Sequence, residues 1–376
     1  MSHFAHARVD LDAIAHNARL LRECAGGTPL MGVVKADGYG HGMLPAARAL
    51  IAGGATWLGT AFIDEALELR RAGLTLPVLA WIIPPGEPVA EAVEADVDLG
   101  VSDRAVLDTV IAEAVRLGRT ARVQLKADTG LNRGGVNPAD WRNLVDAAAR
   151  AEDEGHLRVC GVWSHFACAD EPGHPSIALQ LSRFHEALEI ADKAGLDPEV
   201  RHIANSAALL TLPEARFDLV RGGIAGYGLC PIPDFGATGL RPAMTLRSRI
   251  ALTKRVPAGS GVSYGHRYVT DRETTLALVP LGYADGVPRA ATNKGPVLLG
   301  GRSRVISGTV CMDQFVVDVG DDTVEAGEYA VLFGDPGEDP GVPTAEDWAR
   351  ILDTIPYEIV TRVGVRVPRE YVGAPA

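Results

Sequence analysis

The stretch LMGVVKADGYGHG, residues 30–42, is a short apolar run that ends in Lys35 and then enters a glycine-rich turn. A short apolar run bounded by such a turn is typical of a buried strand. The same unit, an apolar run followed by an amphipathic segment, recurs along the chain. The eight strands predicted in this way cover residues 30–35, 57–61, 77–82, 97–101, 121–126, 157–163, 200–204 and 217–221.

The segments between these strands have apolar residues at helical spacing. Residues 62–72 and 103–117 are examples, with Asp103 placed to start the second helix and Gly118 placed to end it. A further helix, at about residues 10–24, precedes the first strand. Eight consecutive strand–helix units predict an α/β fold, a closed parallel (β/α)8 barrel of the TIM type.

The pattern changes near residue 241, from where apolar and polar residues alternate with a period of two. Alternation of this kind with turn residues between the runs predicts β-strands. We therefore expect a barrel domain at 1–240 and a mainly β domain at 241–376. The strands predicted in the second domain cover residues 245–256, 275–281, 304–310, 314–319, 328–333 and 359–367, with one helix near 344–353.

The charge and hydropathy of the chain exclude several classes of partner. Its 376 residues carry a net charge of -12, whereas nucleic acid requires clustered Lys and Arg. The longest apolar stretch, residues 76–83, is too short to span a bilayer, and residues 1–12 show no signal-peptide core. We expect neither nucleic acid nor a membrane as a partner.

The cysteines and histidines show no disulfide or metal pattern. There are five cysteines, an odd number, widely spread and without a CxxC pair. This favours reduced, buried cysteines in a cytoplasmic protein, while a single disulfide or a reactive thiol stays open. The ten histidines show no HxxxH or HExxH spacing, so we expect no metal site.

Polar residues gather where the predicted barrel strands end. In such barrels the active site lies at the C-terminal ends of the strands. The residues that the sequence places there are Lys35, Lys126, Ser164, His165, Asn205, Ser206, Arg221, Gly222 and Gly223. A purely structural barrel could have any one of them, but their joint occurrence predicts a functional site.

Lys35 is the candidate for covalent chemistry. A strand-end lysine commonly extends its amine into solvent, which is the structural alternative. In a desolvated barrel mouth, however, a lysine loses basicity and can bond to an aldehyde cofactor, which Tyr39 is close enough to contact. Ser206 and the glycine turn up to Ile224 follow strands seven and eight, where barrels bind phosphate, although a simple tight turn is the alternative. A lysine and a phosphate cradle together suggest pyridoxal 5'-phosphate.

Nine motifs, in the same order, resemble those of alanine racemases. The resemblance covers nearly the whole chain and implies an N-terminal barrel with a C-terminal β domain. It also implies a homodimer whose active sites are completed by the partner subunit. The motifs are VVKADGYGHG (33–42), LKADTGLNRGG (125–135), SHFACAD (164–170), HIANSAALL (202–210), RGGIAGYGL (221–229), SYGHRY (263–268), LGYADG (281–286), CMDQ (311–314) and PYEIVTRVGVRVPR (356–369).

The resemblance implies a two-base mechanism on a pyridoxal phosphate aldimine. Lys35 would hold the cofactor and act as one base, and Tyr264 from the other subunit would act on the opposite face of Cα. Because Tyr titrates near 10, Tyr264 would need positive charge close by, from His165 or Arg221. Without the resemblance, Tyr264 reads equally well as a packed aromatic of the β domain.

The remaining site residues are also implied by the resemblance. Arg133 and the backbone at Met312 would bind the substrate carboxylate, and the LNRGG context of Arg133 differs from that of some relatives. Lys126 matches a lysine that is carbamylated in some relatives, and whether Trp81 touches the pocket is open. The cofactor-binding candidates are Lys35, Tyr39, His165, Asn205, Ser206, Arg221, which would face the pyridine nitrogen, Gly223, Ile224 and Tyr357.

Three alternatives remain at this point. A broad-specificity amino-acid racemase differs only in its substrate range. An amino-acid decarboxylase of the same architecture would face the pyridine nitrogen with an acidic residue, where this chain has Arg221. A non-enzymatic pyridoxal phosphate carrier would be a lone barrel with no need of Tyr264 and Met312. The family also implies that the product D-alanine supplies the cell wall of a bacterium, or that the enzyme breaks alanine down.

Overall fold

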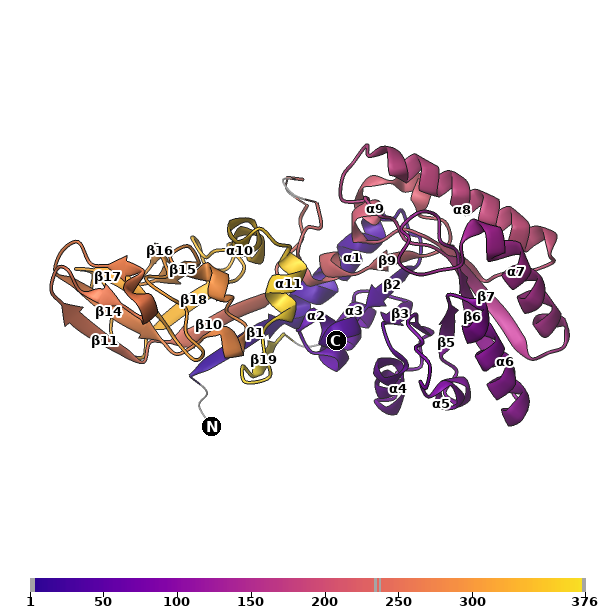
Figure 1. The fold of residues 1–376 in the computed structure, drawn as a ribbon, viewed down its shortest axis with the longest axis horizontal. Helices are drawn as coiled ribbons and strands as arrows, with labels where there is room; N and C mark the ends of the chain where they lie inside the picture. The colour runs from indigo at the N-terminus through magenta and orange to yellow at the C-terminus, as the bar shows by residue number, and fades with distance from the viewer. Residues whose placement is uncertain (1–3, 233–234, 237, 374–376) are drawn as a thin grey trace.

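The computed structural model describes residues 4–232, 235–236 and 238–373. These form a parallel barrel surrounded by helices and a second region built mainly of antiparallel strands, which lie at opposite ends of an elongated molecule (Figure 1). The predicted fold class is therefore confirmed.

The barrel strands are short and almost entirely buried. All eight predicted strands are present, with their ends shifted by up to three residues. They are β2 (Leu30–Val33), β3 (Trp57–Thr60), β4 (Val78–Ala80), β5 (Asp98–Val101), β6 (Ala121–Lys126), β7 (Leu157–Trp163), β8 (Val200–His202) and β9 (Val220–Gly222).

The strands pair in parallel in the order β8-β7-β6-β5-β4-β3-β2-β9. Two backbone hydrogen bonds join the ends of this order, from Asp218 N–H to the carbonyl of Arg201 and from Arg221 N–H to the carbonyl of Ala204, both at 3.1 Å. The barrel is thereby closed, and the C-terminal ends of all its strands surround one mouth.

Helices cover the outside of the barrel. Asp10 and Asp103 accept hydrogen bonds from the first turns of α1 and α6 and so cap these helices, as the sequence indicates for Asp103. The helical segments of this region are α1 (Leu11–Cys24), α2 (Lys35–Tyr39), α3 (Met43–Ala52), α4 (Ile63–Arg71), α5 (Val89–Glu94), α6 (Arg104–Leu117), α7 (Pro138–Asp153), α8 (Pro175–Lys193), α9 (Ser206–Thr211), η1 (Pro213–Ala215) and η2 (Ile224–Tyr227).

The second region contains three sheets within the described residues. Their strand orders are β16-β15-β18-β10-β1-β19, β11-β14-β17 and β12-β13. The elements are β1 (Ala5–Asp10), β10 (Met244–Arg249), β11 (Leu252–Val256), β12 (Gly261–Val262), η3 (Tyr264–His266), β13 (Tyr268–Val269), β14 (Thr274–Val279), η4 (Tyr283–Asp285), η5 (Arg289–Ala291), β15 (Pro296–Leu299), β16 (Arg302–Val305), β17 (Phe315–Gly320), β18 (Tyr329–Phe333), α10 (Ala345–Leu352), α11 (Pro356–Thr361) and β19 (Arg369–Val372).

The strand predicted at 359–367 is wrong. Pro356 occupies the first turn of α11, which runs to Thr361, and a turn follows before β19. The buried residues of the segment are Ile359, Val360, Val363 and Val367, a spacing that suits one face of a helix better than one face of a strand. Figure 1 shows α11 beside α2, next to the barrel.

Two further strand predictions need correction. The run 245–256 is two strands, because the backbone partner changes from Glu328 at Ile250 to Leu278 at Ala251, which moves the chain from one sheet to another. A period-two pattern shows which side chains point inward but not which sheet they join. The strand expected at 304–310 is β16, which ends at Val305.

The N-terminal strand β1 was not predicted, and it pairs with β10 and β19 in the C-terminal region. The described chain therefore runs from β1 in the second region through α1 into the barrel and returns at β10. The boundary at residue 240 stays a prediction.

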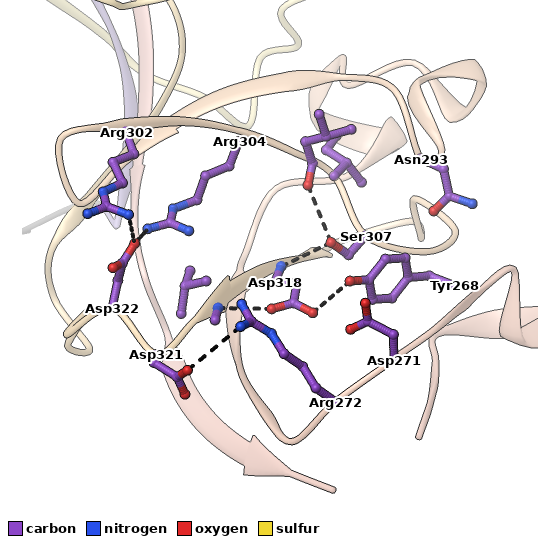
Figure 2. Close-up of a pocket in the computed structure, with 14 residues that line it drawn as sticks. Tyr268, Asp271, Arg272, Asn293, Arg302, Arg304, Ser307, Asp318, Asp321 and Asp322 are labelled. Atoms are coloured by element: carbon purple, nitrogen blue, oxygen red, sulfur yellow. Dashed lines mark hydrogen bonds and ion pairs between the residues drawn. The ribbon is translucent and has the colours of Figure 1, made fainter. Parts of the chain in front are cut away.

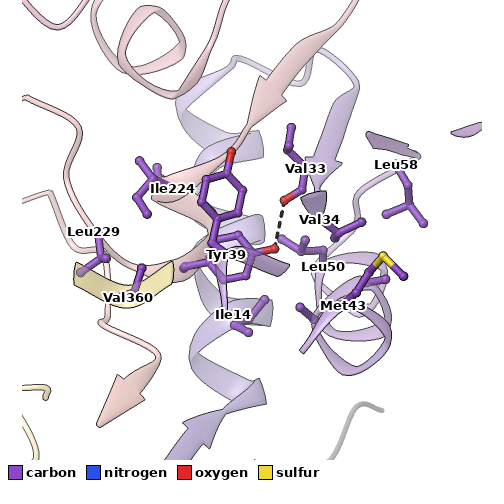
Figure 3. Packing of buried hydrophobic residues seen from close by; sticks show 14 of the residues in the cluster. Ile14, Val33, Val34, Tyr39, Met43, Leu50, Leu58, Ile224, Leu229 and Val360 are labelled. Atoms are coloured by element: carbon purple, nitrogen blue, oxygen red, sulfur yellow. Dashed lines mark hydrogen bonds between the residues drawn. The ribbon is translucent and has the colours of Figure 1, made fainter. Parts of the chain in front are cut away.

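A buried cluster fixes the mouth of the barrel from below. Tyr39 packs against the ring of Tyr227, with centroids 5.0 Å apart, and Tyr227 donates a hydrogen bond to the carbonyl of Val33 at 3.0 Å. Figure 3 shows Tyr39 among the apolar side chains of this cluster, including Ile224 and Val360. The turn after β2 is thus held by Ile224 and Tyr227, which follow β9, and by Val360 of α11.

The remaining sequence expectations concern membrane-spanning segments, cysteines and metal sites. No helix of the described chain is long and apolar enough to cross a membrane. All five cysteines are unpaired, but only Cys160 is buried and the others are half-buried, which corrects the expectation of burial. Within the described ranges, no group of three or more His, Cys, Asp or Glu could hold a metal ion.

Candidate active site

Lys35 is separated from the end of β2 by one residue, Val34, and begins an unusual turn. Ala36, Asp37 and Gly38 all have left-handed backbone angles, with φ of 54°, 52° and 60°. Such angles are strained for residues other than glycine, and strain of this kind gathers at functional sites. The turn is held by Glu65, which accepts a hydrogen bond from the Ala36 N–H at 2.7 Å.

The amine of Lys35 faces two aromatic rings. Its Nζ lies 5.7 Å from the ring centroid of Trp81 and 5.9 Å from that of Tyr39. Trp81 therefore does reach the site, a question that the sequence left open. Burial lowers the pKa of Lys35, and the charges of Arg133 and Arg221 lower it further. The neutral amine is thus made more accessible, as a nucleophile or base requires.

Lys126 is the last residue of β6 and shares the same mouth. Its Nζ lies 4.7 Å from the ring centroid of Trp163. Burial, and then the charges of Arg133 and Arg221, lower the pKa of Lys126 to about 8. Arg133 itself is exposed, on the loop after β6. The lowered pKa values of both lysines report that the cationic groups predicted from sequence converge here.

Arg221, on β9, is buried and is held by residues at or just after the ends of β7 and β8. Its guanidinium donates to Nδ1 of His202 at 2.9 Å and to Nδ1 of His165 at 3.0 Å. It also donates to the carbonyls of Ser164 and Ile203, both at 3.0 Å. Burial lowers the pKa of Arg221 to about 9, so the guanidinium stays protonated at neutral pH. The side chain is a rigid positive charge at the mouth.

His165 cannot supply positive charge as expected. Burial lowers the pKa of His165 well below its usual value, and the charge of Arg221 lowers it further. Because Arg221 only donates, Nδ1 of His165 must accept, so the ring is neutral with its hydrogen on Nε2. Of the two residues considered for lowering the pKa of Tyr264, only Arg221 is charged at neutral pH.

The predicted phosphate cradle lies just after the ends of β8 and β9. The hydroxyl of Ser206 accepts hydrogen bonds from the N–H groups of Gly223, at 2.9 Å, and Ala225, at 3.4 Å. A Cβ at Gly223 would lie 2.7 Å from the hydroxyl of Tyr39, closer than real Cβ contacts come. Glycine is therefore required for this close approach, and η2 begins with the next residue, Ile224.

The C-terminal region contributes Tyr357 to the same place. Its ring lies 6.1 Å from that of Tyr39, because α11 packs beside α2. Burial raises the pKa values of both phenols above the ordinary value, so both remain hydroxyl donors. Hydroxyl and backbone N–H groups are what a phosphate binds, so the residues present suit pyridoxal phosphate.

Asn205 is a cofactor-binding candidate that has a structural task here. Its side-chain oxygen accepts a hydrogen bond from the N–H of Ala208 at 3.1 Å and caps α9. The cap fixes the start of the helix at Ser206. Contact of Asn205 with a cofactor stays a prediction.

Tyr264 and Met312 do not join the barrel mouth within one chain. Tyr264 is 76% exposed and Met312 is 53% exposed. The backbone carbonyl of Tyr264 accepts a hydrogen bond from the Thr309 hydroxyl at 2.7 Å. Its neighbours Ser263 and His266 have positive φ, of 60° and 45°. The tyrosine is thus presented outward on a strained turn, with no partner from the barrel in the described chain.

The sequence reasoning missed several residues that build the site. Trp163, at the end of β7, lies under the cationic groups of both Lys126 and Arg221, and Cζ of Arg221 is 5.3 Å from its ring centroid. His202 ends β8 and accepts from Arg221. Both lie at strand ends, which is the signal that could have identified them.

A separate pocket of about 820 Å³ lies in the C-terminal region (Figure 2). Three of its four carboxylates already have side-chain partners. Asp318 accepts from Tyr268 at 2.7 Å, and Asp321 and Asp322 form ion pairs with nearby arginines. Because these three carboxylates are satisfied by their partners, they are less available for chemistry than the groups at the barrel mouth.

A closed (β/α)8 barrel whose strand ends gather buried cationic side chains at one mouth is the arrangement of a barrel enzyme. Models of the alanine racemase N-terminal and C-terminal domains match residues 9–231 and 243–371. The chain therefore belongs to the alanine racemase family of isomerases. The resemblance seen in the sequence motifs is confirmed.

Individual relatives agree with this assignment over their full length. The chain is 66% identical to the alanine racemase of Thermobifida fusca, over 100% of both chains. It superposes on the crystal structure of alanine racemase from D-cycloserine-producing Streptomyces lavendulae with a TM-score of 0.97 at 58% identity, covering 100% and 98% of the two chains. It also matches the structure of the Bartonella henselae alanine racemase with covalently bound pyridoxal phosphate, with a TM-score of 0.89 at 28% identity, over 99% and 100%.

Proposed function

We propose that this protein interconverts L-alanine and D-alanine, using pyridoxal 5'-phosphate bound at the barrel mouth. One observation carries the proposal: Lys35, Lys126, Arg133 and Arg221 converge on one partly buried site, where the charges of the two arginines lower the pKa values of both lysines and of His165. Such a concentration of positive charge stabilises anions, and both the cofactor phosphate and the substrate carboxylate are anions.

The residues present would hold the cofactor in a defined orientation. Lys35 would bind it covalently, and Arg221 would face its ring nitrogen with His165 beside it. The phosphate would be bound by Tyr39, Ser206, Gly223, Ile224 and Tyr357. When bound, pyridoxal phosphate withdraws electrons from an attached amino acid and makes its Cα proton removable. The covalently bound cofactor of the Bartonella henselae relative supports this assignment.

Racemisation requires proton transfer on both faces of Cα. Lys35 suits one face, because its lowered pKa leaves more of the amine in the neutral form that accepts a proton. Tyr264 of a second copy would serve the other face, and Arg221 is the fixed charge able to favour its ionised form. Arg133 and the backbone at Met312, also from the second copy, would orient the substrate carboxylate.

The proposal therefore includes a homodimer with shared active sites. The outward presentation of Tyr264 and Met312 supports it, since exposed functional groups on a strained turn gain a purpose when a partner covers them. Each mouth would then contain residues of both chains. A monomer would have Lys35 and no second base.

Lys126 is proposed as a site of carbamylation. Its pKa of about 8 leaves a fraction of the amine neutral near pH 7.5, and only the neutral amine can add carbon dioxide. A carbamate would place a negative charge opposite Arg133 and remove the like-charge repulsion between the two side chains. Mass spectrometry of the intact protein under bicarbonate would detect the added mass.

We also propose a cytoplasmic location, where the product would be available for the bacterial cell wall. The five unpaired cysteines support a reducing compartment. If the enzyme instead serves alanine breakdown, the same site residues would act in the same way.

The deciding experiment follows purified protein with each enantiomer of alanine, then with serine and lysine, by chiral chromatography. Equal approach to a racemic mixture from both enantiomers of alanine is expected. Comparable rates with serine and lysine would favour a broad-specificity racemase, and release of carbon dioxide would favour a decarboxylase. Cofactor binding without turnover would identify a carrier and overturn the proposal.

Borohydride reduction tests the attachment site separately. It should fix a pyridoxyl group on the peptide that contains Lys35 and on no other peptide. Recovery of the group on Lys126 or Lys254 would overturn the assignment of Lys35 while leaving racemisation itself intact.

A further inference from the structure

A chain of buried polar side chains runs from the barrel mouth into its interior behind Arg221. Nδ1 of His202 accepts from Arg221 at 2.9 Å, and Nε2 of His202 lies 2.7 Å from Oε1 of Gln124. Nε2 of Gln124 then donates to Oδ2 of Asp98 at 2.8 Å. The four side chains come from four strands, β9, β8, β6 and β5. Of the three residues behind Arg221, only His202 lies at the C-terminal end of a strand.

The direction of every hydrogen bond in this chain is determined by its two ends. A guanidinium can only donate and an ionised carboxylate can only accept. Nδ1 of His202 must therefore accept, so its ring hydrogen lies on Nε2 and points at Gln124. The amide of Gln124 can accept from His202 with its oxygen and donate to Asp98 with its nitrogen. Among side chains of this length without an ionisable group, only glutamine offers both an acceptor and a donor in that arrangement.

The interior is shaped to hold these groups in place. His202, Gln124 and Asp98 have no exposed surface. The ring of His202 stacks on Trp163, with planes 4° apart and centroids separated by 5.7 Å. A Cβ at Gly161 would lie 2.7 Å from Cδ and Oε1 of Gln124, so glycine on β7 leaves room for the amide. The packing allows little reorientation of either side chain.

The last side chain of this hydrogen-bonded series, Asp98, is held at the end of the barrel opposite the mouth. Oδ1 of Asp98 accepts from Nε of Arg122 at 2.6 Å, and Arg122 in turn binds both carboxylate oxygens of Glu199. By contrast, all the groups in the described chain that accept hydrogen bonds from Arg221 are uncharged. Asp98 is thus the carboxylate to which Arg221 is linked, through two neutral side chains rather than by contact.

We propose that Gln124 and Asp98 are positioning residues for Arg221: they fix His202 in the tautomer that accepts from the guanidinium and so hold Arg221 against the cofactor ring. This inference rests on the proposed function. Without the acceptor at Gln124, His202 is free to carry its hydrogen on Nδ1, where it would oppose the N–H of Arg221. Arg221 would then lose a hydrogen bond and shift away from its site.

The test compares three variants of the holoenzyme reconstituted with pyridoxal phosphate. Gln124→Met keeps the length of the side chain and removes both hydrogen bonds. Gln124→Glu, protonated beside Asp98, keeps an acceptor toward His202 and a donor toward Asp98. Cys160→Ala is the matched control, because its thiol also touches Asp98, at 3.2 Å, but lies off the path to Arg221.

We expect Gln124→Met to lower kcat for alanine about tenfold, which is the effect of one lost hydrogen bond to a charged group, with KM changed much less. The absorption maximum of the bound cofactor should shift, because the charge facing its ring moves. Gln124→Glu at pH 6 to 7 and Cys160→Ala should keep both kcat and spectrum near those of the wild type. A Gln124→Met enzyme that matches Cys160→Ala in kcat and spectrum would overturn the inference, as would a Gln124→Glu enzyme as impaired as Gln124→Met.

A measurement on the unmodified protein keeps the inference testable if Gln124→Met does not fold. Neutron diffraction from deuterium-exchanged crystals should place deuterium on Nε2 of His202 and none on Nδ1. Deuterium on Nδ1 would overturn the inference. Failure of the proposed function would appear differently, as a wild-type protein that neither binds pyridoxal phosphate at Lys35 nor racemises alanine.

Discussion

The barrel mouth and the turn that carries Tyr264 are opposite kinds of environment. At the mouth, Arg221 is almost fully buried and the pKa values of Lys35 and Lys126 are lowered by burial. Tyr264 is 76% exposed, on a turn with positive backbone angles on both sides. The mouth is packed within a single chain, whereas the Tyr264 turn is exposed, as contact with a second copy would require. This difference is what the proposed homodimer requires, in which each chain builds half of each of two sites.

The largest expected effect tests this division directly. Lys35→Ala and Tyr264→Phe should each lower kcat by about 10²- to 10⁴-fold, because each removes a group that transfers a proton. Mixing the two inactive proteins should restore activity, since one mouth of a mixed dimer takes its lysine and its tyrosine from intact copies. Recovery should approach half of the wild-type activity per mixed dimer, measured by chiral chromatography after subunit exchange.

Tyr329→Phe is the control for the second variant, since Tyr329 packs against arginines of β10 and should leave activity unchanged. Absence of recovery, with exchange shown by mass-tagged subunits, would mean that both residues act within one chain. In that case the comparison between a complete and an incomplete region would be wrong.

A second prediction concerns the fixed charge at the mouth. Arg221→Glu should lower racemisation about a hundredfold, because a preorganised charge beside the reacting group is lost. It should also let alanine yield pyruvate and a new long-wavelength absorption band, since an acidic residue facing the ring nitrogen favours its protonation. Both are measured after reconstitution with pyridoxal phosphate.

Arg221→Lys is the companion variant for this test, because it keeps the charge but not the four hydrogen bonds to neighbouring strands. It should slow racemisation without forming pyruvate. If Arg221→Glu binds the cofactor and racemises at the wild-type rate without pyruvate, Arg221 only anchors the strand, and the mouth owes nothing to its charge.

A third prediction concerns the phosphate cradle. Gly223→Ala places a methyl group 2.7 Å from the hydroxyl of Tyr39, so one of the two must move. We expect the Kd for pyridoxal phosphate to rise about tenfold, the effect of losing one charge-assisted hydrogen bond. Gly226→Ala is the matched control, because its Cβ would meet only the side chain of Leu50, at 3.2 Å. Equal affinities of the two variants would remove Gly223 from the cradle.

The barrel and much of its mouth could be predicted from the sequence because the signal is local. Each strand is a short apolar run, and Lys35, Lys126 and Ser206 lie at or after strand ends by simple counting. The series of buried hydrogen bonds from Arg221 to Asp98 could not be predicted in this way. Gln124 and His202 are 78 residues apart, and only the closed barrel brings them together.

The second region was harder to predict for physical reasons. Val363, Val365 and Val367 are β-branched and alternate with other residues, yet Pro356 starts a helix before them and Val365 is exposed. Strand β1 precedes the barrel but pairs with β10 and β19, a long-range choice that no local pattern encodes. The role of Tyr264 was implied by the resemblance alone, and the described part of its own chain gives it no partner at the mouth.

The smallest expected effect concerns stability at the junction of the two regions. His41 is fully buried, and its Nδ1 lies 2.9 Å from the carbonyl of Tyr39. Burial lowers the pKa of His41 to about 4, whereas the unfolded chain keeps a value near 6.5. Below pH 6.5 the unfolded state therefore binds more protons than the folded state, so the free energy of unfolding falls as the pH falls toward 4.

Between about pH 7.5 and pH 5 this histidine should cost the wild type about 2 kcal/mol of stability, as 1.5 pK units imply. His41→Asn can still donate to the same carbonyl but does not titrate, so it should lose that much less over the same interval. Urea unfolding at both pH values measures the difference, and the buried His165 and His202 act equally in both proteins and cancel. The absolute stability of His41→Asn will be lower because the ring contact with Tyr227, at 4.6 Å, is lost. If the two proteins show the same loss between the two pH values, His41 becomes protonated without unfolding, and the junction beside the mouth is more accessible to water than its packing indicates.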